Sequence, residues 1–235
     1  MDIFGGKTTL ISRGIVKLFI GRASNLKISL LDPIIEEGPM PKRGMKPIRR
    51  QQLIDAAIAS IHEHGFSSAT VARIARKAGV STGIVHHYFA DKNDLLAATM
   101  RAMLDILRRE AIERMRVARS PVERIYAIIH ASYGDAQFGE EVFSAWLALY
   151  GNARDSQKLQ RILRIYHRRL HSNLLHELIP LIGRERAQEA AFGIGALIDG
   201  LWLRYALTGR PDDAEAPRAM TRAYADAMIA GKSSR

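Results

Sequence analysis

The chain has 235 residues, no cysteine and a formal net charge of +11 at pH 7. Its length suffices for a sizeable core in one or two domains, and the absence of cysteine excludes disulfides and thiolate metal sites. The basic surplus favours a polyanionic partner, whereas the lack of any uncharged apolar run of about 20 residues indicates a cytoplasmic protein without a membrane segment.

Residues 1–39 do not share the pattern of the rest of the chain. Four basic residues interrupt their apolar stretch, which leaves no core for a signal peptide. Residues 5–9, Gly-Gly-Lys-Thr-Thr, resemble the end of a phosphate-binding loop, but the first glycine of such a loop is missing, so we interpret the likeness as chance. Because Met40 begins a segment that looks like a natural N-terminus, we predict that residues 1–39 are a disordered extension.

A first helix is predicted over about residues 47–64. Apolar side chains recur there at helical spacing, Pro47 suits the first turn, and Gly65 ends the helix. A basic arm leads into it, formed by Lys42, Arg43, Lys46, Arg49 and Arg50. Residues 40–95 carry nine lysines and arginines against four acids, a surplus that would neutralise phosphate charges.

Residues 70–89 predict two short helices joined by a tight turn. Thr70 caps the first helix, and Gly79 ends it because glycine adopts a left-handed conformation without strain. The apolar face of this helix consists of Ala72, Ile74, Ala75 and Ala78. Small side chains on that face let a second helix cross close by.

The second short helix is capped by Ser81 or Thr82 and runs to about His87. Apolar residues that can hold it to the domain are Ile84, Val85 and Phe89, and the residues left on its outer side are Thr82, Gly83, His86 and His87. A helix–turn–helix needs this division, because its second helix faces the domain on one side and a DNA groove on the other.

The rest of the chain is predicted to be helical. Asp91 caps a long helix, and further helices follow at about 121–134, 138–152, 155–179, 184–208 and 214–230. Glycines and prolines, including Pro180, separate them, and no strand alternation is present. We therefore predict an all-α fold.

The run from Thr70 to Leu96 resembles the DNA-binding signature of TetR-family transcriptional regulators. The residues that carry the likeness are the turn Ala78-Gly79-Val80-Ser81-Thr82-Gly83, the pair Tyr88-Phe89, the pair Asp91-Lys92 and the pair Leu95-Leu96. The resemblance implies a three-helix helix–turn–helix head at residues 40–95 and a helical ligand-binding and dimerisation bundle at residues 96–235. It also implies a homodimer that presents two recognition helices to near-palindromic operator DNA.

Carried over by position, the resemblance assigns DNA contacts to Thr70, Ser81, Thr82, Gly83, His86, His87, Tyr88 and Lys92. Threonine and histidine can bond base edges in the major groove. Tyr88 and Lys92 match phosphate-contacting positions, and Lys92 lies where a helix N-terminus already attracts phosphate. Under the alternative reading, Tyr88 is core and His86 and His87 are solvated surface.

Two aromatic stretches stand out in the C-terminal half. Trp146 and Tyr150 share a helix face at i,i+4, and Asp199 and Trp202 share another at i,i+3. A buried Asp199 would need a partner, and a bound cation would serve, since aromatic faces are the usual housing of a quaternary ammonium. The alternative is that the three aromatic residues are ordinary core.

These stretches resemble one branch of the family, the choline-responsive repressors of the glycine-betaine synthesis genes. The likeness implies a repressor of choline uptake and oxidation genes, with choline as effector and Trp146, Tyr150, Asp199 and Trp202 as ligand-binding residues. A TetR-type repressor of another pathway, such as efflux, with a different ligand is the alternative. No nucleophile elbow, phosphate loop or metal triad is present, so we expect no enzyme, no cofactor and no catalytic residue.

Two further features concern the helices of the C-terminal half. His167 and His171 have the i,i+4 spacing of a zinc pair, but four nearby arginines disfavour a cation, and we predict a solvated or interface role and no metal. The helices at about 184–208 and 214–230 should pair with their symmetry mates. Ala191, Gly195 and Ala196 would allow close helix approach there.

Overall fold

The computed structural model describes residues 45–209 and 213–231. Within these ranges the chain forms α-helices and one short 3-10 helix, with no strand, as the all-α prediction requires. The predicted extension, residues 1–39, lies outside the described residues, as do Lys42 and Arg43 of the basic arm.

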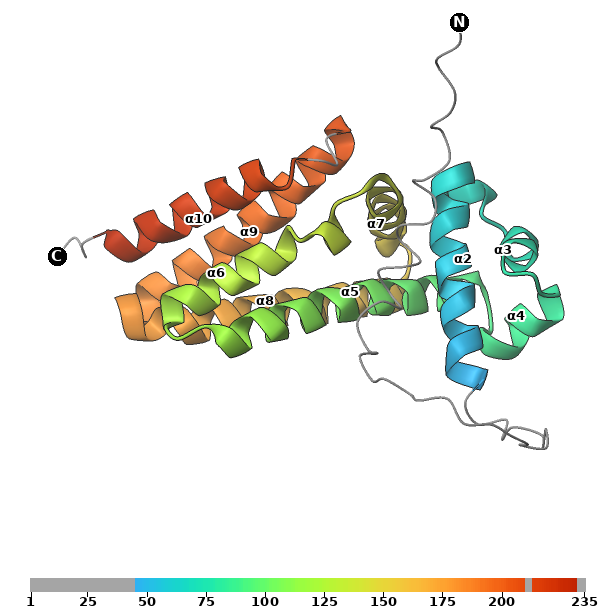
Figure 1. The fold of residues 1–235 in the computed structure, drawn as a ribbon, viewed down its shortest axis with the longest axis horizontal. Coiled ribbons are helices and arrows are strands. Elements are labelled where there is room, and N and C mark those ends of the chain that lie inside the picture. Colours follow the sequence, from blue (N-terminus) through green and yellow to red (C-terminus); the bar gives the residue numbers. More distant parts are fainter. Residues whose placement is uncertain (1–44, 210–212, 232–235) are drawn as a thin grey trace, which may run out of the picture. The chain divides into compact units, whose positions relative to one another are not determined.

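The helices follow one another through short connections (Figure 1). In chain order they are α2 (Met45–Ser68), α3 (Val71–Lys77), α4 (Thr82–Tyr88), α5 (Lys92–Val117), α6 (Pro121–Ser132), the 3-10 helix η1 (Asp135–Gln137), α7 (Glu140–Ala153), α8 (Gln157–Ile182), α9 (Arg184–Thr208) and α10 (Glu215–Ala230). In Figure 1 the short helices α3 and α4 lie against α2, while α5, α6, α8, α9 and α10 run alongside one another.

The first three helices enclose a small hydrophobic core. Its buried side chains come from α2, α3, α4 and the start of α5, and include Leu53, Ile54, Ile74, Val85, Phe89 and Leu95. The backbone of α2 breaks at Gly65, whose φ is 74°, so the predicted helix end is a kink followed by one more turn. Two predicted core contacts are wrong, because Ala72 is exposed and Ile84 is 39 % exposed.

The remaining helices enclose a larger core around α8 and α9, with α5, α6, α7 and α10 packed against them. The prediction that Pro180 ends the helix before α9 is wrong, because α8 continues to Ile182. Proline removes only one backbone hydrogen bond there, close to the helix end, and Gly183, with a φ of 76°, provides the stop.

Helix α9 is long and apolar enough to cross a membrane by length and composition. In the fold it packs against α8 and α10 and contributes buried residues, among them Ile194, Ile198 and Trp202, to the larger core. The apolar residues of α9 therefore form two faces, one buried in the core and one exposed, the latter with Phe192, Leu203 and Leu207.

Candidate functional site

Helix α4 presents a polar surface because its ends and its inner face are fixed locally. Ser81 is the cap, and its hydroxyl accepts a hydrogen bond from the backbone N–H of Ile84 at 3.4 Å. Val85 and Phe89 are buried and hold the helix to α2 and α3. The residues left exposed are Ser81, Thr82, Gly83, Ile84, His86 and His87.

Thr70 and Tyr88 flank this surface in different ways. The Thr70 hydroxyl accepts a hydrogen bond from the backbone N–H of Arg73 at 3.3 Å, so this exposed residue caps α3. Tyr88 is half-buried and packs on the smaller core, with its ring 5.3 Å from that of His87 in an edge-to-face arrangement. Part of the Tyr88 side chain therefore packs on the core, and part of it remains exposed.

Lys92 is engaged within the protein. Its ammonium donates a hydrogen bond to the carbonyl oxygen of Phe66 at 2.9 Å and lies 4.3 Å from the centre of the Phe66 ring. Partial burial lowers the pKa of Lys92. A phosphate contact by this side chain would require it to leave Phe66, and the contact remains a prediction.

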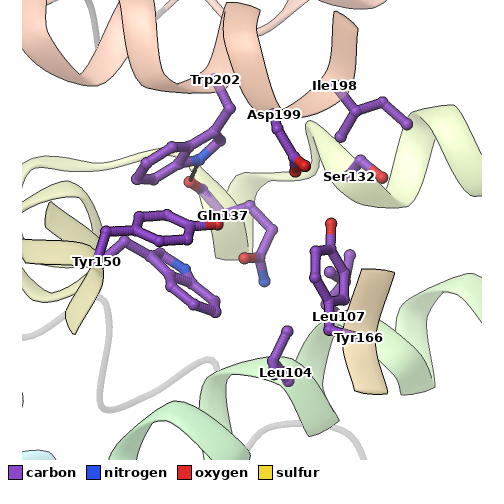
Figure 2. A pocket seen from close by; sticks show the side chains of 10 residues that line it. Leu104, Leu107, Ser132, Gln137, Tyr150, Tyr166, Ile198, Asp199 and Trp202 are labelled. Atoms are coloured by element: carbon purple, nitrogen blue, oxygen red, sulfur yellow. Dashed lines mark hydrogen bonds between the residues drawn. The ribbon is translucent and has the colours of Figure 1, made fainter. Parts of the chain in front are cut away.

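The predicted ligand residues meet in one cavity of the larger core (Figure 2). Trp146 and Tyr150 reach it from α7, and Asp199 and Trp202 from α9. Six further residues complete the lining: Leu104 and Leu107 of α5, Ser132 of α6, Gln137 of η1, Tyr166 of α8 and Ile198 of α9. The cavity is narrow, with a volume of about 30 Å³.

Three aromatic rings form one side of the cavity. The rings of Trp146 and Tyr150 stack with centres 5.5 Å apart, and the ring of Trp202 lies 6.3 Å from the first and 6.1 Å from the second. The indole N–H of Trp202 donates a hydrogen bond to the carbonyl oxygen of Gln137 at 3.0 Å, which fixes the ring (Figure 2). The electron-rich ring faces suit a cation without hydrogen-bond donors.

The negative charge of the cavity comes from Asp199. Burial, together with this carboxylate, raises the pKa of Tyr150 and that of Tyr166, so both hydroxyls are neutral. Asp199 is not the buried carboxylate that the sequence predicts, because its side chain is 38 % exposed. It has a partner in the imidazole Nε2 of His167 on α8, 3.1 Å from its Oδ2.

Three residues at the site that the sequence does not predict lie outside α7 and α9, the two helices that carry the predicted residues. Tyr166 and His167 lie more than thirty residues before Asp199, and Gln137 lies in a connection with no periodic pattern. The apolar and aromatic character of α8 at Tyr166 fits a plain core helix equally well. Only packing in three dimensions identifies these residues as part of the site.

Comparison with known proteins agrees on one family. A model described as "Bacterial regulatory proteins, tetR family" matches residues 53–99, and one described as "BetI-type transcriptional repressor, C-terminal" matches residues 121–230. The HTH-type transcriptional regulator BetI of Brucella suis is 46 % identical over 195 residues, which cover 83 % of this chain and 98 % of the relative. The chain belongs to the BetI-type TetR-family regulators.

A further relative is of the same type, and two solved structures have the same fold. The BetI regulator of Klebsiella pneumoniae is 46 % identical over 184 residues, 77 % of this chain and 94 % of its own length. A transcriptional regulator of Pseudomonas aeruginosa has a crystal structure with a TM-score of 0.68 and 26 % identity, covering 79 % of this chain and 92 % of that chain. A regulator of Saccharomonospora viridis, solved in complex with choline, has a TM-score of 0.65 and 18 % identity over 77 % of this chain and 96 % of that chain.

This membership identifies α3 and α4 as a helix–turn–helix, because the matched residues 53–99 contain both helices. The BetI-type chain is thus a DNA-binding transcriptional repressor and not an enzyme. The cavity lies in the part of the chain that the BetI-type C-terminal model matches, apart from Leu104 and Leu107.

Proposed function

We propose that this BetI-type repressor controls choline uptake and glycine-betaine synthesis genes in the cytoplasm, and that choline is its effector. The observation that carries the proposal is the cavity in which three aromatic rings and one carboxylate face the same space. A quaternary ammonium has a full charge but no N–H to donate, so it is recognised by ring faces and a nearby anion. The choline complex of the Saccharomonospora viridis regulator shows that a protein of this fold can house such a cation.

We propose that ligand binding is transmitted to the DNA-binding head through α7, which lines the cavity and also contacts α2. Because the cavity is narrow, we expect choline to enter by separating Trp146 and Tyr150 of α7 from Trp202 of α9. Helix α7 also packs along α2, where the Ser144 hydroxyl lies 3.1 Å from Nδ1 of His62. A shift of α7 would therefore move the DNA-binding head, and by linkage DNA would disfavour the ligand.

We propose that DNA is bound by the chain as a homodimer on a near-palindromic operator. An exposed apolar row follows one face of α9 and continues on α10, with Phe192 at 74 % exposure as its most exposed member. The row consists of Phe192, Ala196, Gly200, Leu203 and Leu207 of α9 and Met220 of α10. Of the three small residues predicted for helix approach, only Ala196 lies in this row, because Ala191 is buried and Gly195 faces Leu170 of α8.

Two measurements test the dimer. Sedimentation of the wild-type protein should give twice the monomer mass, and Phe192→Glu should shift it toward monomer because a charge would be buried twice at a two-fold interface. Val117→Glu, an equally exposed apolar position at the end of α5, is the matched control and should remain dimeric. A monomeric wild type would remove the proposed assembly.

Within the head, we propose that Thr82, Gly83, His86 and His87 meet bases or the adjoining backbone. Thr70, Tyr88 and Lys92 would contact phosphates, and Ser81 would position α4 through its cap. We propose a head at residues 40–95 and a ligand body from residue 96 onward. The two hydrophobic cores follow this division except that Ile61 and Ala69 belong to the larger core and Ala98 to the smaller one. Footprinting with the gene's own upstream DNA tests these assignments, and protection that survives replacement of both His87 and Lys92 by alanine would contradict them.

Calorimetric titration of choline tests the effector. Trp146→Ala should weaken binding by about 1–2 kcal/mol, the size of one desolvated cation–π contact. Asp199→Asn should also weaken it, because it removes the negative charge that faces the cation. Unchanged affinity in both variants would eliminate the cavity as the choline site. A thermal-shift screen distinguishes the other candidate, a TetR-type repressor of another pathway, which would be stabilised by some other class of molecule and not by choline-like cations.

A further inference from the structure

Asp199 lies between the aromatic cavity and the imidazole of His167. On one side the carboxylate lines the aromatic cavity, toward which it points in Figure 2. On the other side its Oδ2 is 3.1 Å from Nε2 of His167, one helix away on α8. Among the described residues no other hydrogen bond to this carboxylate is present, so His167 is its one side-chain partner there, and the rest of the carboxylate faces the cavity and solvent.

Four arginines lie near His167 in the sequence of α8: Arg161, Arg164, Arg168 and Arg169. Arginine stays protonated throughout the pH range of proteins, so these residues add no pH dependence. Three tyrosines interact with the charge of Asp199: Tyr133, which follows α6, Tyr150 of α7 and Tyr166 of α8. All three have a pKa raised mainly by burial, so they are uncharged. Helix α5 contributes only Leu104 and Leu107 to the cavity. The electrostatic state of the site in the absence of ligand therefore depends on Asp199 and on whether His167 carries a proton.

We propose that His167 sets the cation affinity of the effector site, because its protonated ring and a cationic effector compete for the Asp199 carboxylate. This inference rests on the proposed function. When His167 is neutral, the pair has a net negative charge that attracts a cation into the aromatic cavity. When His167 is protonated, the pair is neutral and the imidazolium repels the incoming charge.

Thermodynamic linkage gives the direction of the effect. The hydrogen bond with Asp199 raises the pKa of His167 above its usual value, while its partial burial opposes this. A bound cation lowers that pKa again, so binding releases a proton, and affinity must fall as the pH drops through the range between the two pKa values. One proton released gives at most a tenfold change in affinity for each pH unit.

The experiment is calorimetric titration of the full-length protein with choline between about pH 6 and pH 8.5. Choline has no group that titrates in this range, so any dependence belongs to the protein. Affinity at the acid end should be about tenfold weaker than at the basic end. Dimethylbutanol, the neutral isostere in which carbon replaces the ammonium nitrogen, should bind without this loss, since it does not compete with a proton.

Two variants locate the effect. His167→Gln keeps an uncharged donor of similar reach, and it should bind choline with an affinity independent of pH and tighter than wild type at the acid end. His171→Gln, one turn further along α8, is the matched control and should keep the wild-type dependence. The other histidine with a shifted pKa is His130, and burial is the main cause that lowers its pKa, the direction opposite to that of His167.

The outcomes separate the inference from the function on which it rests. Choline binding with the same affinity at every pH, or a dependence that persists in His167→Gln, would overturn the role of His167 and leave the choline effector in place. Absence of choline binding at every pH would overturn both. Loss of the dependence in His167→Gln but not in His171→Gln is the result that supports competition.

Discussion

The two functional regions of this repressor are built in opposite ways. The proposed DNA-facing surface comes from one seven-residue helix, α4, whose cap and two anchoring side chains lie within nine consecutive residues. The proposed ligand cavity draws its lining from α5, α6, η1, α7, α8 and α9, over almost one hundred residues of sequence. Function in the head therefore depends on exposed side chains with local support, and function in the body depends on long-range packing.

The difference implies that substitutions act through different quantities. Removing an exposed side chain from α4 leaves the core intact, so DNA affinity should change while the free energy of unfolding does not. Removing a group that joins two helices of the body should change stability first and ligand affinity as a consequence. The following predictions test this separation, beginning with the body.

The largest effect is expected for the ion pair that joins α6 to α8. The Arg124 Nε donates to the Glu177 carboxylate at 2.7 Å, and the Glu177 side chain is only 5 % exposed. Arg124→Met leaves that charge buried without a partner, which should lower the free energy of unfolding by about 3 kcal/mol. Chemical denaturation measures this loss.

A double variant is the control for this prediction. With Arg124→Met and Glu177→Leu together, both charges are replaced by apolar groups of similar size, and most of the lost stability should return. If the double variant is as unstable as the single one, the pair acts through packing of the arginine stem and not through its charge.

The second prediction concerns the head. His87→Ala should weaken operator binding by about 2 kcal/mol, roughly thirtyfold, the range of one lost base contact. Because His87 is exposed, the free energy of unfolding of the variant should stay within about 0.5 kcal/mol of that of wild type. Fluorescence anisotropy with upstream DNA measures the affinity, and His64→Ala, an exposed histidine on α2, should change neither quantity. A large loss of stability in His87→Ala would break the proposed separation.

A matched pair of helix caps gives the third prediction. Ser81 caps α4 and Ser120 caps α6, and both hydroxyls accept from a backbone N–H three residues on. Replacing either by alanine should cost about 1 kcal/mol of stability. Only Ser81→Ala should also weaken DNA binding, because the residues proposed to contact bases lie on α4 and none lies on α6. Equal DNA affinity of the two variants would show that α4 needs no cap to read DNA.

The same contrast decides how much could be predicted from sequence. The helix ends of the head can be predicted from the sequence because each depends on a residue at that end. Ser81 and Asp91 cap helices, and Gly79 ends one. Ile84 was assigned to the wrong side, since a helix of two turns has too few residues to define its buried face. Exposure of such a residue depends on the crossing angle with α3, which no local pattern contains.

In the body, the sequence predicts the helix positions and four cavity residues, but it does not predict which side chains of different helices contact one another. Trp146 and Trp202 stood out because large aromatic side chains are rare in this chain. The pairing of His167 with Asp199 had no signal, because each residue lies on its own helix and the register between α8 and α9 arises from core packing. Pro180 was misjudged because proline near a helix end costs one hydrogen bond at most.

The smallest effect is expected for the stability that the His167–Asp199 pair gives to the fold. The pKa of His167 is raised in the folded state by its hydrogen bond with Asp199. A raised pKa means that the folded protein holds the proton more tightly than the unfolded chain, whose histidine titrates near about 6.5. The stabilisation is therefore complete below that pH and is lost as the pH rises through the folded-state pKa.

Comparison of wild type with His167→Gln isolates this term. Both side chains are more than one third exposed, at 49 % and 38 %, so solvent screening limits the contribution to less than about 1 kcal/mol. Wild type should exceed the variant in free energy of unfolding by this amount at about pH 5.5 and by nothing at about pH 8.5. His130, whose pKa is lowered, destabilises the fold toward acid in both proteins and cancels in the difference. A difference that grows toward basic pH would show that the pair does not stabilise the fold as an ion pair.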